Sequence, residues 1–392
     1  MRHFEHLDDD ARDALFSQQP HEIPADAAAT EVGRWMGATL YLPASRPFVV
    51  ADLVRQRAKG VVAAVIDFED SVSDREALDS RSRAGSILHE MSACAEDLPM
   101  IFLRMRDYAD PVRIVADAHN LPRRLAGFAF PKFDPAANGD AMLESLADSS
   151  RMAGRRLVGM PILETPALAF NETRQAFLEA TTALLKSAEG SIACVRIGVT
   201  DIAGIFGLRR SPDTTIYDIK VVADVLTSVV NAFVRPSHDA IPVSGPVWEY
   251  FATSDRILKP RLRSTPFVDH QATRIRESMV KAGLDALLSE ITLDRLNGLW
   301  GKTVIHPSHV GVVHALSVVS FEEHQDALAI VARESDGGVY PSPAGNKMNE
   351  VRPHMAWARS VLQRARIFGA ARAEVDFVDF LLASGALEST AR

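Results

Sequence analysis

The sequence predicts an α/β fold, a (β/α)8 TIM barrel, with an N-terminal arm before it and a C-terminal helical appendage after it. From residue 38 onward, short apolar runs alternate with longer amphipathic stretches, as repeated βα units do. Eight such runs occur before residue 307. Charged residues gather directly after them, at what would be the C-terminal face of a barrel. At 392 residues the chain can form one barrel of about 250 residues plus appendages.

Residues 1–36 are polar and interrupted by Pro20 and Pro24, which predicts a short helix and an irregular arm. The expected strands are 38–42, 61–67, 100–104, 127–131, 157–163, 193–198, 240–243 and 302–306. Apolar residues recur every three or four positions in 75–91, 166–185 and 217–233, which indicates helices. We expect the barrel to span 37–317 and the appendage 318–392, with a loop at 337–346. Residues 244–270 exceed a usual connection of about 2–6 residues, so we expect a lid or an interface element there.

The composition is that of a globular protein, with 47% hydrophobic and 24% charged residues. A net charge of −8 argues against nucleic-acid binding, which needs clustered Lys and Arg. Cys94 and Cys194 form neither a zinc motif nor a disulfide framework. No apolar run approaches the roughly 18 residues that span a bilayer, and the N-terminus has no apolar leader. We therefore expect a cytoplasmic protein without a membrane partner.

Charged residues at the strand ends are the candidates for a site. They are Asp67, Glu69, Asp70, Arg104, Arg106, Lys132, Asp134, Glu164, Asp201 and His306. Glu164 follows the fifth predicted strand and Asp201 the sixth. Carboxylates on adjacent barrel strands can converge on one Mg²⁺, which takes one or two protein carboxylates and keeps several waters. The alternative makes both residues helix N-caps or ion-pair partners.

Motifs in most of the predicted strands carry a family resemblance. They are LYLPASRP (40–47), VIDFEDSVSD (65–74), LRMR (103–106), PKFD (131–134), ILETP (162–166), IGVTDIAGIFG (197–207) and GKTVIHPSHV (301–310). In this order they resemble the citrate lyase β-subunit and HpcH/HpaI aldolase family, which also includes malyl-CoA lyases. The overall pattern is similar to the barrel lyases encoded beside tellurium-resistance and stress-response genes.

The resemblance implies a carbon–carbon lyase that holds Mg²⁺, or Mn²⁺ as a substitute, on Glu164 and Asp201. Arg104 would clamp the carboxylate of an oxo-acid or hydroxy-acid, because a guanidinium pairs bidentately with carboxylate. Asp67, Glu69 and Asp70 would hold Arg104, Lys132 and metal-bound waters in place, or serve only the fold. The implied reaction is aldol-type or Claisen-type cleavage or formation of a β-hydroxy acid through a metal-stabilised enolate.

The chain also departs from the family pattern. Asp134 stands where the family usually has Glu, and PVSGPVWEY (242–250) replaces an acidic stretch at the seventh strand. Glu350, in GNKMNEVRP, stands where the family has an Asp that some members bring into a neighbouring subunit's site. The general base is therefore open between Glu350 and a metal-bound water, and Glu350 can equally be an exposed acid at a helix start.

Two further groups of residues could bind a ligand or serve only the surface and the fold. Arg209 and Arg210 can bind a phosphate or a second carboxylate at the barrel mouth, or simply face solvent. His306 resembles the family's IHP motif, where it supports the eighth strand, and a zinc site with His309 and His314 is disfavoured because both fall on the following helix.

Three functions stay open at this stage. The first is the Mg²⁺-dependent lyase acting on a small oxo-acid or hydroxy-acid, which can be phosphorylated, nucleoside-linked or CoA-linked. The second is an acyl-CoA lyase or thioesterase, and the third a non-catalytic barrel subunit of a biosynthetic complex. We expect a homo-oligomer, since trimers and hexamers are common in the resembled family.

Overall fold

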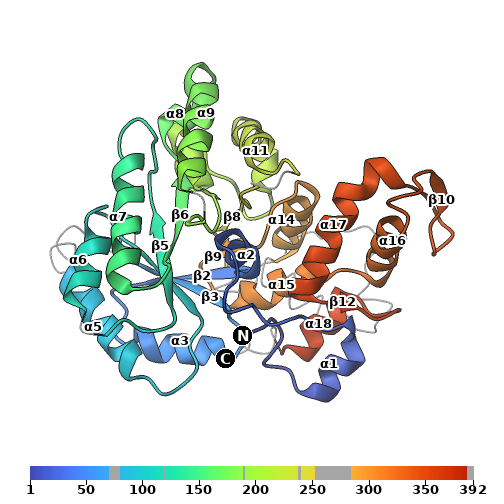
Figure 1. Cartoon of the computed structure of the whole chain (residues 1–392), viewed down its shortest axis with the longest axis horizontal. Coiled ribbons are helices and arrows are strands. Elements are labelled where there is room, and N and C mark those ends of the chain that lie inside the picture. The colour runs from blue at the N-terminus through green and yellow to red at the C-terminus, as the bar shows by residue number, and fades with distance from the viewer. Residues whose placement is uncertain (70–79, 119, 189, 237–239, 252–283, 386–392) are drawn as a thin grey trace.

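The computed structural model describes residues 1–69, 80–118, 120–188, 190–236, 240–251 and 284–385. Within these ranges an eight-stranded parallel sheet has the order β7-β6-β5-β4-β3-β2-β9-β8 (Figure 1). Its strands are β2 (Ala38–Pro43), β3 (Ala63–Asp67), β4 (Met100–Arg104), β5 (Leu125–Phe130), β6 (Val158–Leu163), β7 (Arg196–Ile197), β8 (Gly245–Trp248) and β9 (Lys302–Val304).

The two edges of this sheet meet and close the barrel. The Val195 amide donates to the Pro242 carbonyl at 2.9 Å, and the Ser244 amide donates to the Val195 carbonyl at 2.9 Å. The predicted TIM barrel is confirmed. Because the strands run parallel, their C-terminal ends all open at one face.

Helices cover the outside of the barrel (Figure 1). They are α3 (Val49–Arg57), α5 (Ser80–Ala93), α6 (Asp110–Asp117), α7 (Gly139–Ala153), α8 (Pro166–Ala169), α9 (Asn171–Ser187), α10 (Val199–Ile205), α11 (Lys220–Phe233), α14 (Asp285–Leu296) and α15 (Ser308–Ser317). In α11 the apolar residues recur every three or four positions and therefore lie on one face of the helix. That face is buried and contains Val222, Val225, Leu226 and Val229.

Two elements of the structure differ from those expected from the sequence. The seventh strand is Gly245–Trp248 and not 240–243, where Val243 makes only a bridge to Val195. Ile241 and Val243 are buried without belonging to a regular strand, which is why their apolar run was misleading. The helix expected over 166–185 is two helices, because Phe170 adopts an extended backbone (φ −88°, ψ 136°). Residues 75–79 and 252–270 of the expected helix and insertion lie outside the described residues.

The N-terminal arm and the C-terminal appendage pack together beside the barrel. The arm holds α1 (Asp9–Leu15), β1 (Phe16–Gln18) and α2 (Ala29–Trp35). The appendage holds α16 (Phe321–Val331), β10 (Val339–Pro341), β11 (Met348–Glu350), α17 (Val351–Phe368), β12 (Ala370–Ala371) and α18 (Phe377–Ala383). Strands β1 and β12 pair antiparallel, and α1 lies beside α18 (Figure 1). The domain limits drawn from the sequence stay a prediction.

Helix α2 lies against the barrel at the N-terminal end of its strands. A Cβ at Gly33 would sit 1.9 Å from the Ala193 carbonyl oxygen, so only glycine allows this approach. Arg34 donates to the Ala240 carbonyl at 3.1 Å. This end of the barrel is therefore occupied by the arm, and the opposite end is left for a site.

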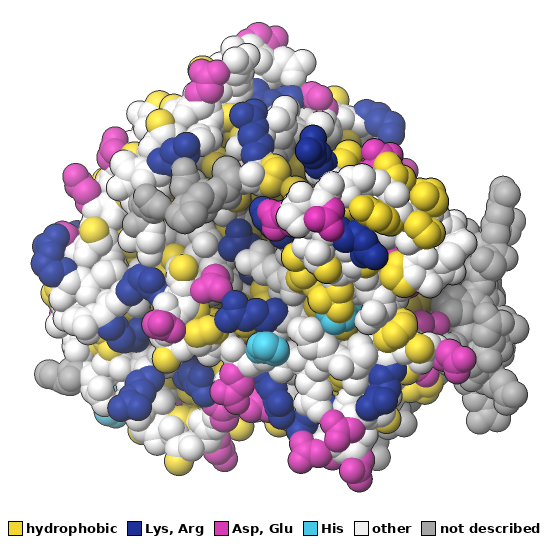
Figure 2. Space-filling view, turned by 45° about the vertical axis from the view of Figure 1, so that its right-hand side comes forward, with side chains coloured by type: hydrophobic (Ala, Val, Ile, Leu, Met, Phe, Trp, Pro, Cys, Tyr) yellow, Lys and Arg dark blue, Asp and Glu magenta, His cyan; other side chains and the backbone are white. Residues whose placement is uncertain are grey.

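Acidic and basic side chains are interspersed on the face drawn in Figure 2. Among the described helices, none combines the length and the apolar character that a membrane crossing requires.

Candidate active site

A cavity of about 260 Å³ opens at the C-terminal end of the strands. Its polar lining comes from six of the barrel's βα units: Tyr41, Arg104, Glu164, Arg196, Thr200, Asp201, Glu249 and Thr303. The cavity thus brings together Arg104, Glu164 and Asp201, which are far apart in the sequence. This is the face where barrel enzymes place their active sites.

Glu164 follows the last residue of β6 and is 5% exposed. Its Oε1 accepts a hydrogen bond from the Lys132 backbone amide at 2.8 Å. On its other side lies Gly198, where a Cβ would sit 1.9 Å from Glu164 Oε2. Burial, and then the negative charge of Asp201, raise the pKa of Glu164 to about 7. The two carboxyl groups therefore lie close enough to repel each other.

Asp201 is half-buried in the first turn of α10. Neither acid is a helix N-cap, since Thr165 precedes α8 and Gly198 precedes α10. The side chain of Lys132 pairs with Glu69 and does not take Glu164 as its partner. Neither acid is therefore a helix cap, and Lys132 is not the ion-pair partner of Glu164.

Arg104 ends β4 beside the last residue of β3, Asp67, in the parallel register. Its Nε and Nη2 each donate to one Asp67 oxygen at 2.7 Å, and its Nη1 lies 2.9 Å from Glu69 Oε2. Burial lowers the pKa of Arg104, but Asp67 outweighs that effect and the pKa is raised overall. Among the described residues, this cluster thus joins Arg104 and Lys132 to the carboxylates of Asp67 and Glu69.

The loop after β5 places two further predicted residues. Lys132 has a left-handed backbone (φ 50°), which is uncommon for a residue with a Cβ and aims its amide at Glu164. Asp134 accepts from the Ala136 amide at 2.9 Å and, at 3.5 Å, from the Thr165 hydroxyl. Asp134 therefore stabilises the turn before α7. It is not among the residues that line the cavity.

Arg209 and Arg210 behave differently from each other. Arg209 is exposed. Arg210 does not face solvent, because its buried guanidinium donates to Glu249 at 2.6 Å, to Glu290 at 2.5 Å and to the Val247 carbonyl. Arg210 also covers the Trp248 ring at 4.6 Å. It ties β8 to α14 and is a structural residue.

Other candidates lie away from the cavity lining. Glu350 is exposed at the end of β11, in the C-terminal appendage. His306 bonds Ser308 at 2.7 Å and stacks on Phe251. His314 accepts from the Ala38 amide at 3.1 Å, at the N-terminal end of β2. Asp70 lies outside the described residues. Across the described ranges, no three or more His, Cys, Asp or Glu residues are grouped to hold a metal ion.

The sequence interpretation missed Tyr41, Arg196, Thr303 and Glu249. Arg196 and Tyr41 interrupt apolar strands, and a charged or phenolic residue inside such a run was the available signal. Glu249 directly follows β8, the strand whose limits were misjudged. It accepts from Thr200 Oγ1 at 2.8 Å, which joins the first turn of α10 to the segment after β8.

A family comparison identifies the chain. The model of the carbon–carbon bond lyases of the TIM-barrel fold matches residues 31–370. The chain belongs to this family. It is therefore a lyase-family enzyme, related in fold to citrate lyase β-subunits. A sequence comparison with curated proteins found no match.

Solved structures share the fold at low sequence identity. A citrate lyase from Burkholderia xenovorans is 15% identical, with a TM-score of 0.59 over 90% of this chain and 96% of that one. The CitE protein of Mycobacterium tuberculosis, in complex with magnesium, acetoacetate and coenzyme A, is 18% identical, with a TM-score of 0.51 over 85% and 99%. Haloferax volcanii malate synthase is 10% identical, with a TM-score of 0.51 over 76% and 84%.

Proposed function

We propose that this lyase is Mg²⁺-dependent and cleaves or forms a β-hydroxy acid or a related oxo-acid. The observation that carries the proposal is that Glu164 and Asp201 line one cavity. Burial and the negative charge of Asp201 raise the pKa of Glu164 there to about 7. Burial and the negative charge of Asp201 both disfavour an ionised Glu164, and a divalent cation beside the two carboxylates would offset both effects. The proposed site would be completed by a divalent ion.

The residues fit Mg²⁺, with Mn²⁺ as a substitute. The pair supplies two hard oxygen donors, and Mg²⁺ takes one or two protein carboxylates while keeping waters that a substrate can displace. When bound, the ion would supply positive charge that stabilises an enolate as the carbon–carbon bond breaks or forms. The magnesium held by the Mycobacterium tuberculosis CitE structure agrees with this proposal.

The chain's own residues would prepare this site. The Lys132 amide orients Glu164 Oε1, and Gly198 gives Oε2 the room to approach. On the family resemblance, Arg104 is the candidate for the substrate carboxylate, and it lines the cavity. Glu69 and Asp67 would fix Arg104 in place. Glu350 or a water would act as the general base.

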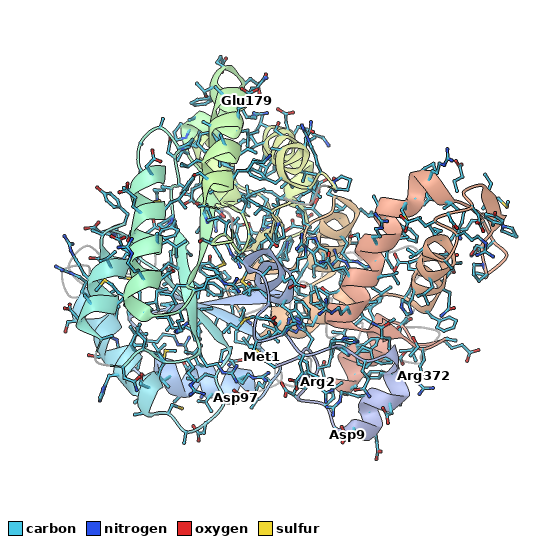
Figure 3. All side chains as sticks on the ribbon, in the orientation of Figure 1. Met1, Arg2, Asp9, Asp97, Glu179 and Arg372 are labelled. Carbon is cyan, nitrogen blue, oxygen red and sulfur yellow. The ribbon has the colours of Figure 1, made fainter. Side chains whose placement is uncertain are left out.

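Metal binding tests the proposal directly. We expect Glu164→Gln and Asp201→Asn each to lower Mg²⁺ affinity by at least about tenfold in calorimetry, because each removes one of two charged donors. Glu179→Gln is the matched control and should bind Mg²⁺ like the wild type, since Glu179 is exposed midway along α9, at the periphery of the molecule (Figure 3). Unchanged Mg²⁺ affinity in both site variants would remove the proposal.

The proposal also covers the location, the oligomeric state and the substrate of the enzyme. We place it in the cytoplasm as a homo-oligomer, a trimer or hexamer, in which Glu350 of one subunit reaches the cavity of another. A small oxo-acid or hydroxy-acid would be the substrate, free or linked to phosphate, a nucleoside or CoA. Sedimentation velocity would give the number of subunits. Calorimetry with CoA would distinguish a CoA-linked substrate from a free acid, because only the linked substrate requires a CoA-binding site.

A further inference from the structure

Arg196 is a buried cation in the wall of the same cavity. Arg196 belongs to β7 and is 2% exposed. Its side chain points into the barrel toward Met160, Thr303 and Tyr41. Nη1 donates to Thr303 Oγ1 at 2.6 Å, and Nε lies 3.4 Å from the Met160 sulfur. The guanidinium carbon lies 5.6 Å from the centre of the Tyr41 ring.

None of these contacts balances the charge of Arg196. Its Nη2 is buried and has no hydrogen-bond partner, and among the described residues no Asp or Glu forms an ion pair with it. By contrast, Arg104 pairs with Asp67 and Glu69, and Arg210 pairs with Glu249 and Glu290. An uncompensated buried charge is costly, so a ligand that supplies the counter-charge would gain from it.

Two neutral donors stand beside Arg196. The Tyr41 hydroxyl has no hydrogen-bond partner within the described part of the chain, and burial raises the pKa of Tyr41, which keeps its proton in place. Thr303 Oγ1 accepts from Arg196, which leaves its own proton free to be donated. Arg196, Tyr41 and Thr303 therefore offer a positive charge with N–H and O–H donors, and all three residues line the cavity.

We propose that Arg196, Tyr41 and Thr303 form an anion subsite that binds the carboxylate of the substrate. The inference rests on the proposed function for the reaction and adds Arg196 to Arg104 as a cation that meets the substrate's carboxylate. Both arginines line the cavity and lie over the Tyr41 ring. A cavity of about 260 Å³ suits a small carboxylic acid, and a planar guanidinium edge matches a carboxylate.

Oxalate binding tests the subsite, because oxalate is a small planar dicarboxylate. We expect the wild type to bind oxalate in calorimetry and Arg196→Gln to weaken that binding by at least about tenfold. Arg196→Lys, which keeps the charge, should recover part of the affinity. Arg151→Gln is the matched control, since Arg151 is exposed on α7 outside the cavity. Mg²⁺ affinity should stay within about twofold of the wild type in Arg196→Gln.

Thermal unfolding separates an anion-binding role from a structural one. Without ligand, Arg196→Met should have the same or a higher Tm than the wild type, because a buried unpaired charge is removed. Oxalate should raise the Tm of the wild type and not of Arg196→Met. A lowered Tm in Arg196→Met together with wild-type oxalate affinity in Arg196→Gln would make Arg196 structural and overturn the inference.

The remaining outcomes are also decisive. If the wild type binds no Mg²⁺, the proposed metal chemistry fails, and the subsite is judged on the metal-free oxalate titrations alone. If the wild type binds oxalate neither with nor without Mg²⁺ at millimolar concentration, the subsite is overturned. If inorganic phosphate binds in an Arg196-dependent way and oxalate does not, the assignment to a carboxylate is overturned.

Discussion

At the scale of single residues, the cavity is organised by which charges are balanced and which are not. Arg104 and Arg210 each contact two carboxylates, whereas Arg196 contacts none among the described residues. Glu164 and Asp201 line the same cavity, and the negative charge of Asp201 contributes to the raised pKa of Glu164. An arginine without an acidic partner and a carboxyl group with a raised pKa in one cavity agree with the two proposals above, a metal ion and a carboxylic acid bound together.

The charge of Glu164 should make stability depend on pH. Its pKa is raised from the ordinary 4.5 to about 7, so the metal-free folded state loses stability as pH rises between these values and bears the full cost above pH 7. We expect Glu164→Gln to be more stable than the wild type at pH 8, by up to about 3 kcal/mol, and nearly equal to it at pH 4. Urea unfolding of both metal-free proteins at the two pH values measures this difference. Equal differences at pH 4 and pH 8 would contradict the pKa shift.

At the scale of elements, short junctions between strands and helices place the charged groups. The path from β7 to α10 brings Gly198 against Glu164, and the left-handed Lys132 turns its amide toward the same carboxylate. Behind the cavity, Lys302 of β9 pairs with Glu290 at 2.8 Å and with Asp294 at 2.7 Å, both on α14. These buried pairs hold the helix against the last strands, because losing one partner would leave a charge without compensation.

Gly198→Ala tests the junction between β7 and α10. The added Cβ would meet Glu164 Oε2 at 1.9 Å, so the carboxylate must move. We expect Mg²⁺ affinity in calorimetry to fall by at least about tenfold. Gly204→Ala, inside α10, is the matched control, because nothing lies within 4 Å of a Cβ built there. That variant should keep the affinity and unfold at an equal or higher temperature. Equal Mg²⁺ affinity in the two variants would refute this role of Gly198.

At the scale of the whole molecule, the two ends of the chain form one lobe. The rings of Phe4 and Phe16 have centroids 5.4 Å apart, and Phe380 of α18 lies 4.9 Å from Phe16. The pairing of β1 with β12 adds backbone hydrogen bonds to this contact. The polar composition of residues 1–36 did not reveal the packing, because a few buried aromatic residues carry it.

Phe16→Ala tests whether the two ends are stabilised together. Removing a fully buried ring should cost about 3–5 kcal/mol locally. We expect hydrogen exchange to speed up in both α1 and α18, while β2 to β6 keep their protection. Phe170→Ala, a change at a ring that is 42% exposed, should leave both helices protected. Faster exchange in α1 alone would show that the lobe is not cooperative.

The sequence by itself determined the barrel and the acids at its mouth. A parallel barrel requires strands that alternate with helices. The spacing of apolar residues distinguishes the two along the chain, so this alternation can be predicted from the sequence. It also placed Arg104, Glu164 and Asp201 at strand ends, which the barrel brings to one face. Only the tertiary structure decided which charges are paired. Arg196 and Arg210 are both arginines beside apolar runs, yet Glu249 and Glu290 neutralise Arg210 and leave Arg196 facing the cavity. Contacts between residues that are tens of positions apart depend on strand register and on loop paths, which local pattern does not encode.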